Sequence, residues 1–262
     1  MAAKASAHRL FVVGGTGFVG QAVCHSALAR GWEVVSLSRH GAPDRSTIVS
    51  RTNNNTSGGV QWVRGDALKP ETYKDHLSGC TAVVHSVGVL MENSYKKLVS
   101  IGSSGGAVSS QEAATYEKAN RDTALSVARA AREVSGIDAF VYMSASDVLP
   151  FLDSRYISTK REAENDLIEH RDQMRPVILR PGFIFSPSRP ITMPIAAGVK
   201  AFNTVFHQTP LGCVLKYTPF AKAASPALRR EVLANAIINA IEDPKVSGIL
   251  NIADIESLGN RH

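Results

Sequence analysis

The sequence lacks long apolar runs, paired cysteines and basic tracts. No window approaches the roughly 18 consecutive apolar residues that a membrane-spanning helix needs, so no such helix is expected. The three cysteines, Cys24, Cys80 and Cys213, lie far apart and form neither a CxxC pair nor a His/Cys cluster. Their odd number and wide spacing favour a reducing compartment and predict no structural metal site.

Long basic tracts are missing although the charge balance is basic. The chain has 29 Lys and Arg against 23 Asp and Glu, which gives a net charge of +6 and a pI near 9.3. No basic run is longer than a pair such as Lys96-Lys97, and no aromatic ladder is present on which bases could stack. This pattern argues against a nucleic-acid partner and leaves phosphate-bearing ligands or an anionic membrane surface.

What the sequence does contain is a regular alternation of apolar strands and helices. Its 262 residues, 44% hydrophobic and 20% charged, suffice for the core of one α/β domain with a small lobe. The alternation predicts a Rossmann-type, doubly wound parallel sheet. We expect strands at 10–13, 33–38, 60–64, 82–85, 139–143, 177–180 and near Ile249, and helices at 19–30, 70–77, 113–134, 156–169 and 226–241.

The alternation stops where an apolar, proline-punctuated stretch begins at Pro187. We therefore predict a dinucleotide-binding Rossmann domain over residues 1–185 and a C-terminal substrate or lid region over 186–262, packed on the same domain. Residues 191–220 could line a pocket for a hydrophobic ligand or rest on a membrane surface, and the alternative is ordinary core and lid packing. Polar, loop-like insertions are expected at 40–59 and 100–111.

A glycine-rich turn follows the first predicted strand and opens the first helix. A dinucleotide site needs glycine where the chain turns sharply, where backbone approaches pyrophosphate, and where helix packs closely on strand. The pyrophosphate then binds the N–H groups and the positive dipole end of the helix. This strand–turn–helix context separates the motif from a purely structural turn. The predicted cofactor contacts are Gly14, Thr16, Gly17, Phe18, Val19 and Gly20.

The end of the second strand bears on the choice of cofactor. Sites that prefer NAD commonly place an acid there, whereas this strand ends in Ser38-Arg39-His40. An arginine can pair with a 2′-phosphate through two charge-assisted hydrogen bonds. Ser38 and Arg39 therefore favour NADP(H) over NAD(H), and the alternative is that Arg39 is a solvated strand-end charge.

Gly65-Asp66-Ala67 follows the third predicted strand. The Asp66 carboxylate could accept a hydrogen bond from the adenine amino group, with Ala67 beside it. The alternative is that Asp66 is the N-cap of the next short helix, and the residues alone leave both open.

A tyrosine and a lysine lie four residues apart in Tyr156-Ile157-Ser158-Thr159-Lys160, on one face of a predicted helix. Free tyrosine has a pKa of about 10, too high for efficient proton transfer at neutral pH. A nearby lysine charge lowers that pKa, and the lysine can also hold the nicotinamide ribose. Such a pair also arises by chance, and its place one helix after the fifth strand is what favours Tyr156 as general acid/base.

These motifs together resemble the short-chain dehydrogenase/reductase superfamily, in its extended-to-atypical branch. The glycine turn, Gly65-Asp66, the Tyr156/Lys160 pair and Arg180-Pro181-Gly182 fall in family order across nearly the whole chain. The resemblance implies an NAD(P)-dependent oxidoreductase. It also implies further cofactor contacts at Ser86, Val87, Gly88, Tyr156, Lys160, Pro181, Gly182, Phe183 and Ile184.

Three runs, at 85–93, 156–164 and 179–185, are similar to those of fungal mitochondrial coenzyme Q biosynthesis proteins, a group similar in turn to the nucleotide-binding accessory subunit of respiratory complex I. The resemblance implies partners in the coenzyme Q biosynthetic complex, a quinone-like substrate and peripheral membrane association. It also implies a location on the matrix side of the inner mitochondrial membrane. Residues 1–9 lack acids and fit the tail of a presequence, or else a disordered start.

Two motifs depart from the catalytic pattern of the superfamily. The usual serine pair after the fifth strand is replaced by Ser144-Ala145-Ser146, in which Ser144 or Ser146 could serve and Ala145 cannot. The usual glycine-rich motif after the fourth strand is replaced by Ser86-Val87-Gly88. These changes leave cofactor binding intact and put hydride transfer in doubt.

Three functions are therefore compatible with the sequence. The first is a reductase or dehydrogenase in which Tyr156 transfers the proton, Lys160 tunes it and Ser144 positions the reacting oxygen. The second is a cofactor-binding scaffold or regulatory subunit that NADP(H) stabilises without turnover. The third is isomerase, epimerase or lyase chemistry with transient hydride transfer.

Overall fold

The computed structural model describes residues 8–43, 59–88, 117–146, 154–188, 193, 197 and 226–261. The predicted loops at 40–59 and 100–111, the apolar stretch at 191–220 and the first seven residues fall wholly or mostly outside these ranges. Among the residues that the structure describes, no helix is long and apolar enough to cross a membrane.

Seven parallel strands form one sheet in the order β3-β2-β1-β4-β5-β6-β9. They are β1 (Arg9–Val13), β2 (Glu33–Ser38), β3 (Val60–Arg64), β4 (Ala82–His85), β5 (Ala139–Met143), β6 (Arg175–Leu179) and β9 (Gly248–Leu250). The doubly wound fold predicted from the sequence is confirmed, and each strand lies within two residues of its predicted bounds. The order of the strands reverses between β1 and β4, which places a ligand crevice at their carboxyl ends.

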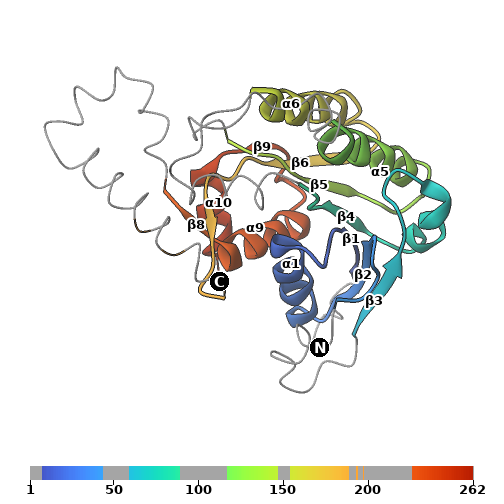
Figure 1. The fold of residues 1–262 in the computed structure, drawn as a ribbon, viewed down its shortest axis with the longest axis horizontal. Helices are drawn as coiled ribbons and strands as arrows, with labels where there is room; N and C mark the ends of the chain where they lie inside the picture. Colours follow the sequence, from blue (N-terminus) through green and yellow to red (C-terminus); the bar gives the residue numbers. More distant parts are fainter. Residues whose placement is uncertain are drawn as a thin grey trace, which may run out of the picture.

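Helices cover both faces of this sheet (Figure 1). One face carries α1 (Phe18–Ala29), α9 (Arg230–Glu242) and α10 (Ile252–Gly259), and the other carries η1 (Pro70–Thr72), η2 (Lys74–Leu77), the π-helical η3 (Glu117–Asp122), α5 (Thr123–Arg132) and α6 (Ser154–Glu169). Neighbouring residues of a strand point to opposite faces: Val34 packs in the first core layer, while Val35 and Leu37 pack in the second. The inner strands β1, β4, β5 and β6 are buried on both faces, which explains why their sequences are nearly continuous apolar runs.

The last long helix begins later than predicted. Instead of starting the helix at 226, the chain forms β8 (Leu228–Arg229), which pairs in parallel with β7 (Ile184–Phe185). The Leu228 N–H donates to the Phe183 carbonyl at 2.7 Å, and α9 starts only after this pairing. A partner more than 40 residues earlier in the chain decides the conformation, so local helical periodicity could not predict it. The sequence prediction also omitted α10, although its Asn251/Asp254 capping box is a local signal.

The carboxyl end of α9 is held by a guanidinium from the neighbouring strand. Arg175, the first residue of β6, donates to the carbonyls of Ala240 at 3.0 Å, Ile241 at 3.1 Å, Asp243 at 3.4 Å and Val246. A helix leaves its last carbonyls without intrahelical partners, and a cation there also complements the helix dipole. Arg175 therefore fixes α9, and with it one layer of the core, to the sheet.

Replacing Arg175 with methionine should destabilise the protein by about 2–3 kcal/mol, because several buried carbonyls lose a charged donor. The free energy of unfolding, measured with urea, gives the comparison. Arg171→Met is the matched control, since Arg171 is exposed. Equal stability of the two variants would show that α9 does not depend on this cap.

Candidate functional site

The glycine turn lies at the carboxyl end of β1, beside residues 86–88. The Gly14 N–H donates to the Leu37 carbonyl at 2.9 Å, and the Ser86 hydroxyl donates to the Val13 carbonyl at 2.8 Å. A Cβ on Gly14 would lie only 3.1 Å from the Val87 side chain, and φ there is +86°. The structure thus brings the predicted contacts Gly14, Ser86 and Val87 together at the crevice.

The same turn fits a dinucleotide on physical grounds. A Cβ on Gly20 would stand 2.2 Å from the Gly14 carbonyl oxygen, so the first turn of α1 lies directly against the backbone of the loop. Gly17 is the N-cap of α1 and brings no side-chain acceptor to the first N–H groups. The positive end of α1, where Phe18 and Val19 begin the helix, is therefore available to an anion such as pyrophosphate. Thr16 contributes its carbonyl to the Gln21 side chain at 2.9 Å.

Ser38 and Arg39 lie at the carboxyl end of β2. The Ser38 hydroxyl donates to the Gly41 carbonyl at 2.6 Å and so closes the turn on which Arg39 is exposed. Asp66 is half-buried, and its carboxylate accepts from the Leu68 N–H at 3.0 Å. The prediction that Asp66 is the N-cap of the next helix is wrong, because the N-cap of η1 is Lys69.

Lys160 is buried in the middle of the site. Its side chain is 1% exposed, and its Nζ donates to the Met143 carbonyl at 2.8 Å and the Val87 carbonyl at 3.4 Å. The ammonium also lies 4.8 Å from the centroid of the Tyr142 ring. Burial lowers the pKa of Lys160 to about 7, against a smaller opposing effect of the Glu164 charge. This amine can gain or lose a proton near neutral pH.

Next to Lys160 lies a buried amide that the sequence prediction missed. Asn120 is fully buried, and neither its amide nitrogen nor its amide oxygen has a hydrogen-bond partner among the described residues. A Cβ on Gly88 would lie 3.7 Å from both the Asn120 Oδ1 and the Lys160 Nζ. Unpaired buried amides are rare in native proteins and indicate a missing partner. A polar residue inside an alanine-rich helix was the signal available in the sequence.

Two buried tyrosines, Tyr142 and Tyr156, lie near Lys160. The Tyr142 hydroxyl donates to the Asn120 backbone carbonyl at 2.9 Å. Burial, followed by the charges of Tyr156 and Glu164, raises the pKa of Tyr142 well above its ordinary value, so this phenol stays protonated. Tyr156 is also buried, one helical turn before Lys160 on α6.

His85, the last residue of β4, adds a neutral imidazole beneath this group. Its Nε2 lies 3.0 Å from the Thr123 hydroxyl, and its ring centroid lies 5.8 Å from that of Tyr142. Burial and the charge of Lys160 lower the pKa of His85 to about 3, so the imidazole stays neutral near pH 7. Lys160 is thus the buried base of this cluster that titrates near neutral pH.

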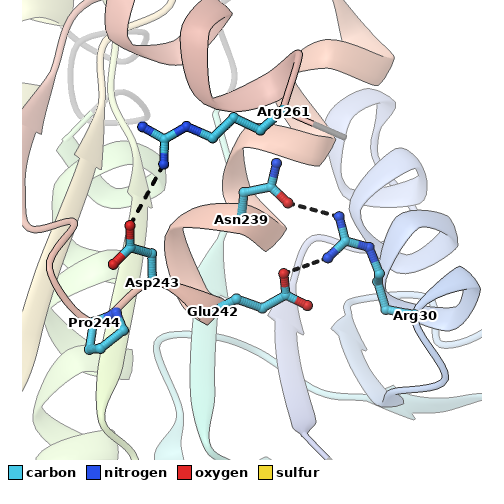
Figure 2. Close-up of a pocket in the computed structure, with 6 residues that line it drawn as sticks. All are labelled: Arg30, Asn239, Glu242, Asp243, Pro244 and Arg261. Carbon is cyan, nitrogen blue, oxygen red and sulfur yellow. Dashed lines mark hydrogen bonds and ion pairs between the residues drawn. The ribbon is translucent and has the colours of Figure 1, made fainter. Parts of the chain in front are cut away.

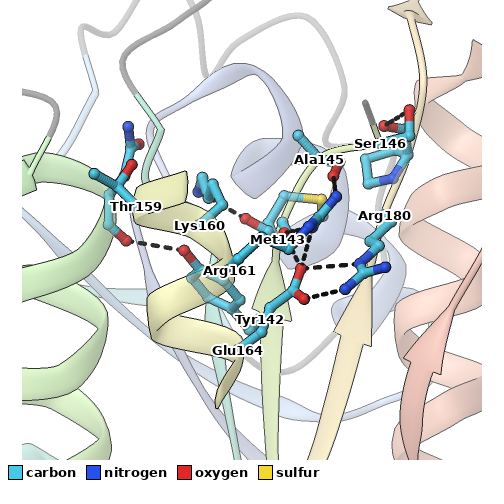
Figure 3. A network of polar contacts seen from close by, with 12 residues as sticks. Tyr142, Met143, Ala145, Ser146, Thr159, Lys160, Arg161, Glu164 and Arg180 are labelled. Carbon is cyan, nitrogen blue, oxygen red and sulfur yellow. Dashed lines mark hydrogen bonds and ion pairs between the residues drawn. The ribbon is translucent and has the colours of Figure 1, made fainter. Parts of the chain in front are cut away.

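A second polar network joins α6 to the ends of β5 and β6 (Figure 3). The carboxylate of Glu164, 1% exposed, accepts from Arg161, from Arg180 and from the Ser144 hydroxyl. Burial alone would raise the pKa of Glu164, but the bonds from Arg180 and Ser144 and the nearby guanidinium charges outweigh it and hold the pKa below its usual value. The predicted active-site hydroxyl of Ser144 is therefore engaged with Glu164.

The segment after β6 borders the same crevice. The Pro181 carbonyl accepts from the N–H of Ser146 at 2.9 Å and from its hydroxyl at 3.0 Å, which ties this segment to the end of β5. Phe183 and Ile184 are buried, and Gly182 is half-buried. The structure therefore places the predicted residues that follow β1, β2, β3, β4, β5 and β6 along one edge of the sheet.

A separate pocket of about 560 Å³ lies at the opposite edge, between the carboxyl ends of α1 and α9 (Figure 2). Its charged groups are paired: Arg30 binds Glu242 and the Asn239 side chain, and Arg261 lies 3.7 Å from Asp243. These contacts leave no convergent unpaired group to orient a ligand. The crevice at the carboxyl edge is accordingly the candidate site.

The chain is similar in sequence or fold to several known proteins. MIOREX complex component 2 of Saccharomyces cerevisiae is 29% identical over 94% of this chain and 98% of its own length. A 2-alkyl-3-oxoalkanoate reductase of Stenotrophomonas maltophilia is 26% identical over 68% of this chain and 52% of its own length. The crystal structure of a short-chain dehydrogenase/reductase family oxidoreductase from Burkholderia thailandensis superposes with a TM-score of 0.62 at 19% identity, covering 94% of this chain and 91% of that one.

The family described as NAD(P)H-binding matches residues 14–201, from the first glycine of the turn to beyond β7. This range contains the glycine turn, Asn120, the Tyr156/Lys160 pair and the Glu164 network. This match identifies the chain as a member of the NAD(P)H-binding family, and its fold is like that of short-chain dehydrogenase/reductase structures.

Proposed function

We propose that the protein is an NADP(H)-dependent oxidoreductase of the short-chain dehydrogenase/reductase type. Its substrate is a quinone-related or polyprenyl intermediate of mitochondrial coenzyme Q biosynthesis. The observation that carries the oxidoreductase proposal is the buried Lys160 amine, which titrates near neutral pH beside the unpaired Asn120 amide. A lysine with a purely structural role has no reason to be buried beside an amide that lacks hydrogen-bond partners.

In this proposal each residue has a defined task. The glycine turn and the positive end of α1 hold the pyrophosphate, and Lys160 holds the nicotinamide ribose. The bound nicotinamide supplies hydride chemistry. Tyr156 exchanges the proton with the substrate oxygen, and the Lys160 charge makes that exchange easier by lowering the phenol pKa. Ser144 orients the same oxygen, for which its hydroxyl would have to leave Glu164.

The biological setting rests on the resemblance of three sequence runs and on a relative. The yeast relative is named as a component of a complex, which supports membership of this chain in a multiprotein assembly. We place that assembly on the matrix side of the inner mitochondrial membrane, with coenzyme Q biosynthetic proteins as partners and peripheral contact with the membrane. The relative named as a 3-oxoalkanoate reductase supports chemistry at a carbonyl group.

A second function is favoured by the bonding at the end of β5. The Ser144 hydroxyl is held by Glu164, and Ala145 has no hydroxyl to replace it. A site without a free serine could still bind NADP(H) and stabilise the fold by mass action. The alternative is thus a non-catalytic NADP(H)-binding scaffold or regulatory subunit of the same complex, or of an assembly of the complex I type.

Tyr156→Phe should lower turnover by about 100-fold or more while NADPH binding is retained, because only the exchangeable proton is removed. Turnover is measured from the absorbance of the reduced nicotinamide at about 340 nm, with a panel of quinone-ring and polyprenyl intermediates as substrates. Ser158→Ala, exposed on the same helix, is the control. If the wild type turns over no intermediate and Tyr156→Phe still supports coenzyme Q synthesis in cells, the oxidoreductase proposal is wrong and the non-catalytic scaffold is supported.

The wild-type protein should bind NADPH more tightly than NADH. Arg39→Gln should weaken NADPH binding by about tenfold or more and leave NADH binding unchanged, because one charge-assisted pair with the 2′-phosphate is lost. Titration of both cofactors by intrinsic fluorescence or calorimetry provides the measurement. Tighter binding of NADH by the wild type would contradict the preference.

The buried amine also predicts a pH dependence of stability. Its folded pKa of about 7 lies below its ordinary value of 10.5, so the unfolded chain binds more protons between these values. The stability of the wild type relative to Lys160→Met should therefore rise with pH over this window, by up to about 1.4 kcal/mol per unit. Urea unfolding at several pH values tests it. Lys245→Met, at an exposed lysine, should show no such slope.

A further inference from the structure

The turn after β2 folds back onto the last residue of β3. The Ser38 carbonyl accepts from the Gly65 N–H at 3.0 Å and from the Gly41 N–H at 3.3 Å. Gly41 has φ +74°, and a Cβ placed on it would lie 3.4 Å from the Cβ of Arg64. Arg64 therefore lies directly beside the short turn that carries Arg39.

The register of the sheet shows on which face Arg64 lies. Ser36 is close to the glycine turn, since a Cβ on Gly15 would stand 2.2 Å from its hydroxyl oxygen. Ser38 is two residues further along β2 and shares that face, and Arg64 is its register partner on β3. Arg64 thus projects from the face that the glycine turn and the start of α1 cover, at the carboxyl edge of the sheet.

Both arginines are exposed. Among the residues that the structure describes, neither Arg39 nor Arg64 makes an ion pair or a side-chain hydrogen bond. The acid nearest to Arg64 in sequence, Asp66, uses its carboxylate to accept from the Leu68 N–H. A phosphate monoester carries about −1.5 to −2 charges at pH 7, which one guanidinium cannot balance.

We propose that Arg64 is a second specificity-determining residue, which with Arg39 forms a two-arginine clamp on the 2′-phosphate of NADP(H). The proposal rests on the cofactor preference proposed above and names a residue that the preference did not include. Arg39 approaches from the turn after β2 and Arg64 from the end of β3, and each guanidinium offers a planar fork of donors to the phosphate oxygens. The two charges together match that of the dianion.

The test uses two fragments of the cofactor, 2′,5′-ADP and 5′-AMP, which differ only in the 2′-phosphate. Calorimetry on the full chain compares the wild type with Arg39→Gln, Arg64→Gln and the double variant. Arg171→Gln is the control, because it removes one exposed positive charge near the opposite edge of the sheet. Relative to this control, Arg64→Gln should weaken 2′,5′-ADP binding by about tenfold or more and leave 5′-AMP binding unchanged.

The binding data distinguish a failure of the Arg64 proposal from a failure of the NADP(H) preference. If the wild type binds 2′,5′-ADP more tightly than 5′-AMP and Arg64→Gln matches Arg171→Gln, Arg64 has no part in recognition and the preference stands on Arg39 alone. If the wild type does not distinguish the two fragments, the NADP(H) preference itself falls, and the clamp with it. Arg39 and Arg64 are exposed, so unfolding curves that match the control confirm that any loss is one of binding.

Discussion

The carboxylate of Glu164 joins the ends of β5 and β6 to the helix that carries Tyr156 and Lys160. It receives hydrogen bonds from Arg180 after β6, from Ser144 after β5 and from Arg161 on its own helix. A buried charge with these partners is stable only while all of them stay in place, since an unpaired charge in the core costs several kcal/mol. The network therefore fixes the rotation of α6 about its axis, and with it the direction in which the buried lysine points.

Above this network the protein keeps a small group of polar atoms out of water. Lys160, Asn120 and His85 are all buried, and the polar contacts of the lysine amine are with backbone carbonyls. Such a group is unfavourable for stability and is typical of a site prepared for a ligand that supplies the missing partners. Glu164 makes this arrangement possible because it anchors the helix without neutralising the lysine directly.

The sequence predicts the sheet well and the site in part. The strands follow from apolar runs, and the glycine turn follows from steric requirements that few other residues meet. The hydrogen bond from Ser144 to Glu164 could not be predicted, because it joins residues 20 positions apart whose pairing depends on the packing of α6. The pairing of β7 with β8 and the closeness of Arg64 to the β2 turn depend in the same way on tertiary contacts. Asn120 was missed because helical patterning identifies faces and not unpaired amides.

The packing of α1 against α9 has a consequence for how the chain is made. The Ser26 hydroxyl donates to the Asn235 side chain across 209 residues of sequence, and the apolar residues of α9 complete the core layer that α1 begins. At a synthesis rate of about 5–20 residues per second, α1 leaves the ribosome roughly 10–40 s before its covering helix. During that interval α1 can pack against β1 and β2, but the side of the helix that contacts α9 has no native partner. The core layer that α1 shares with α9 is therefore completed only after the last long helix has been made.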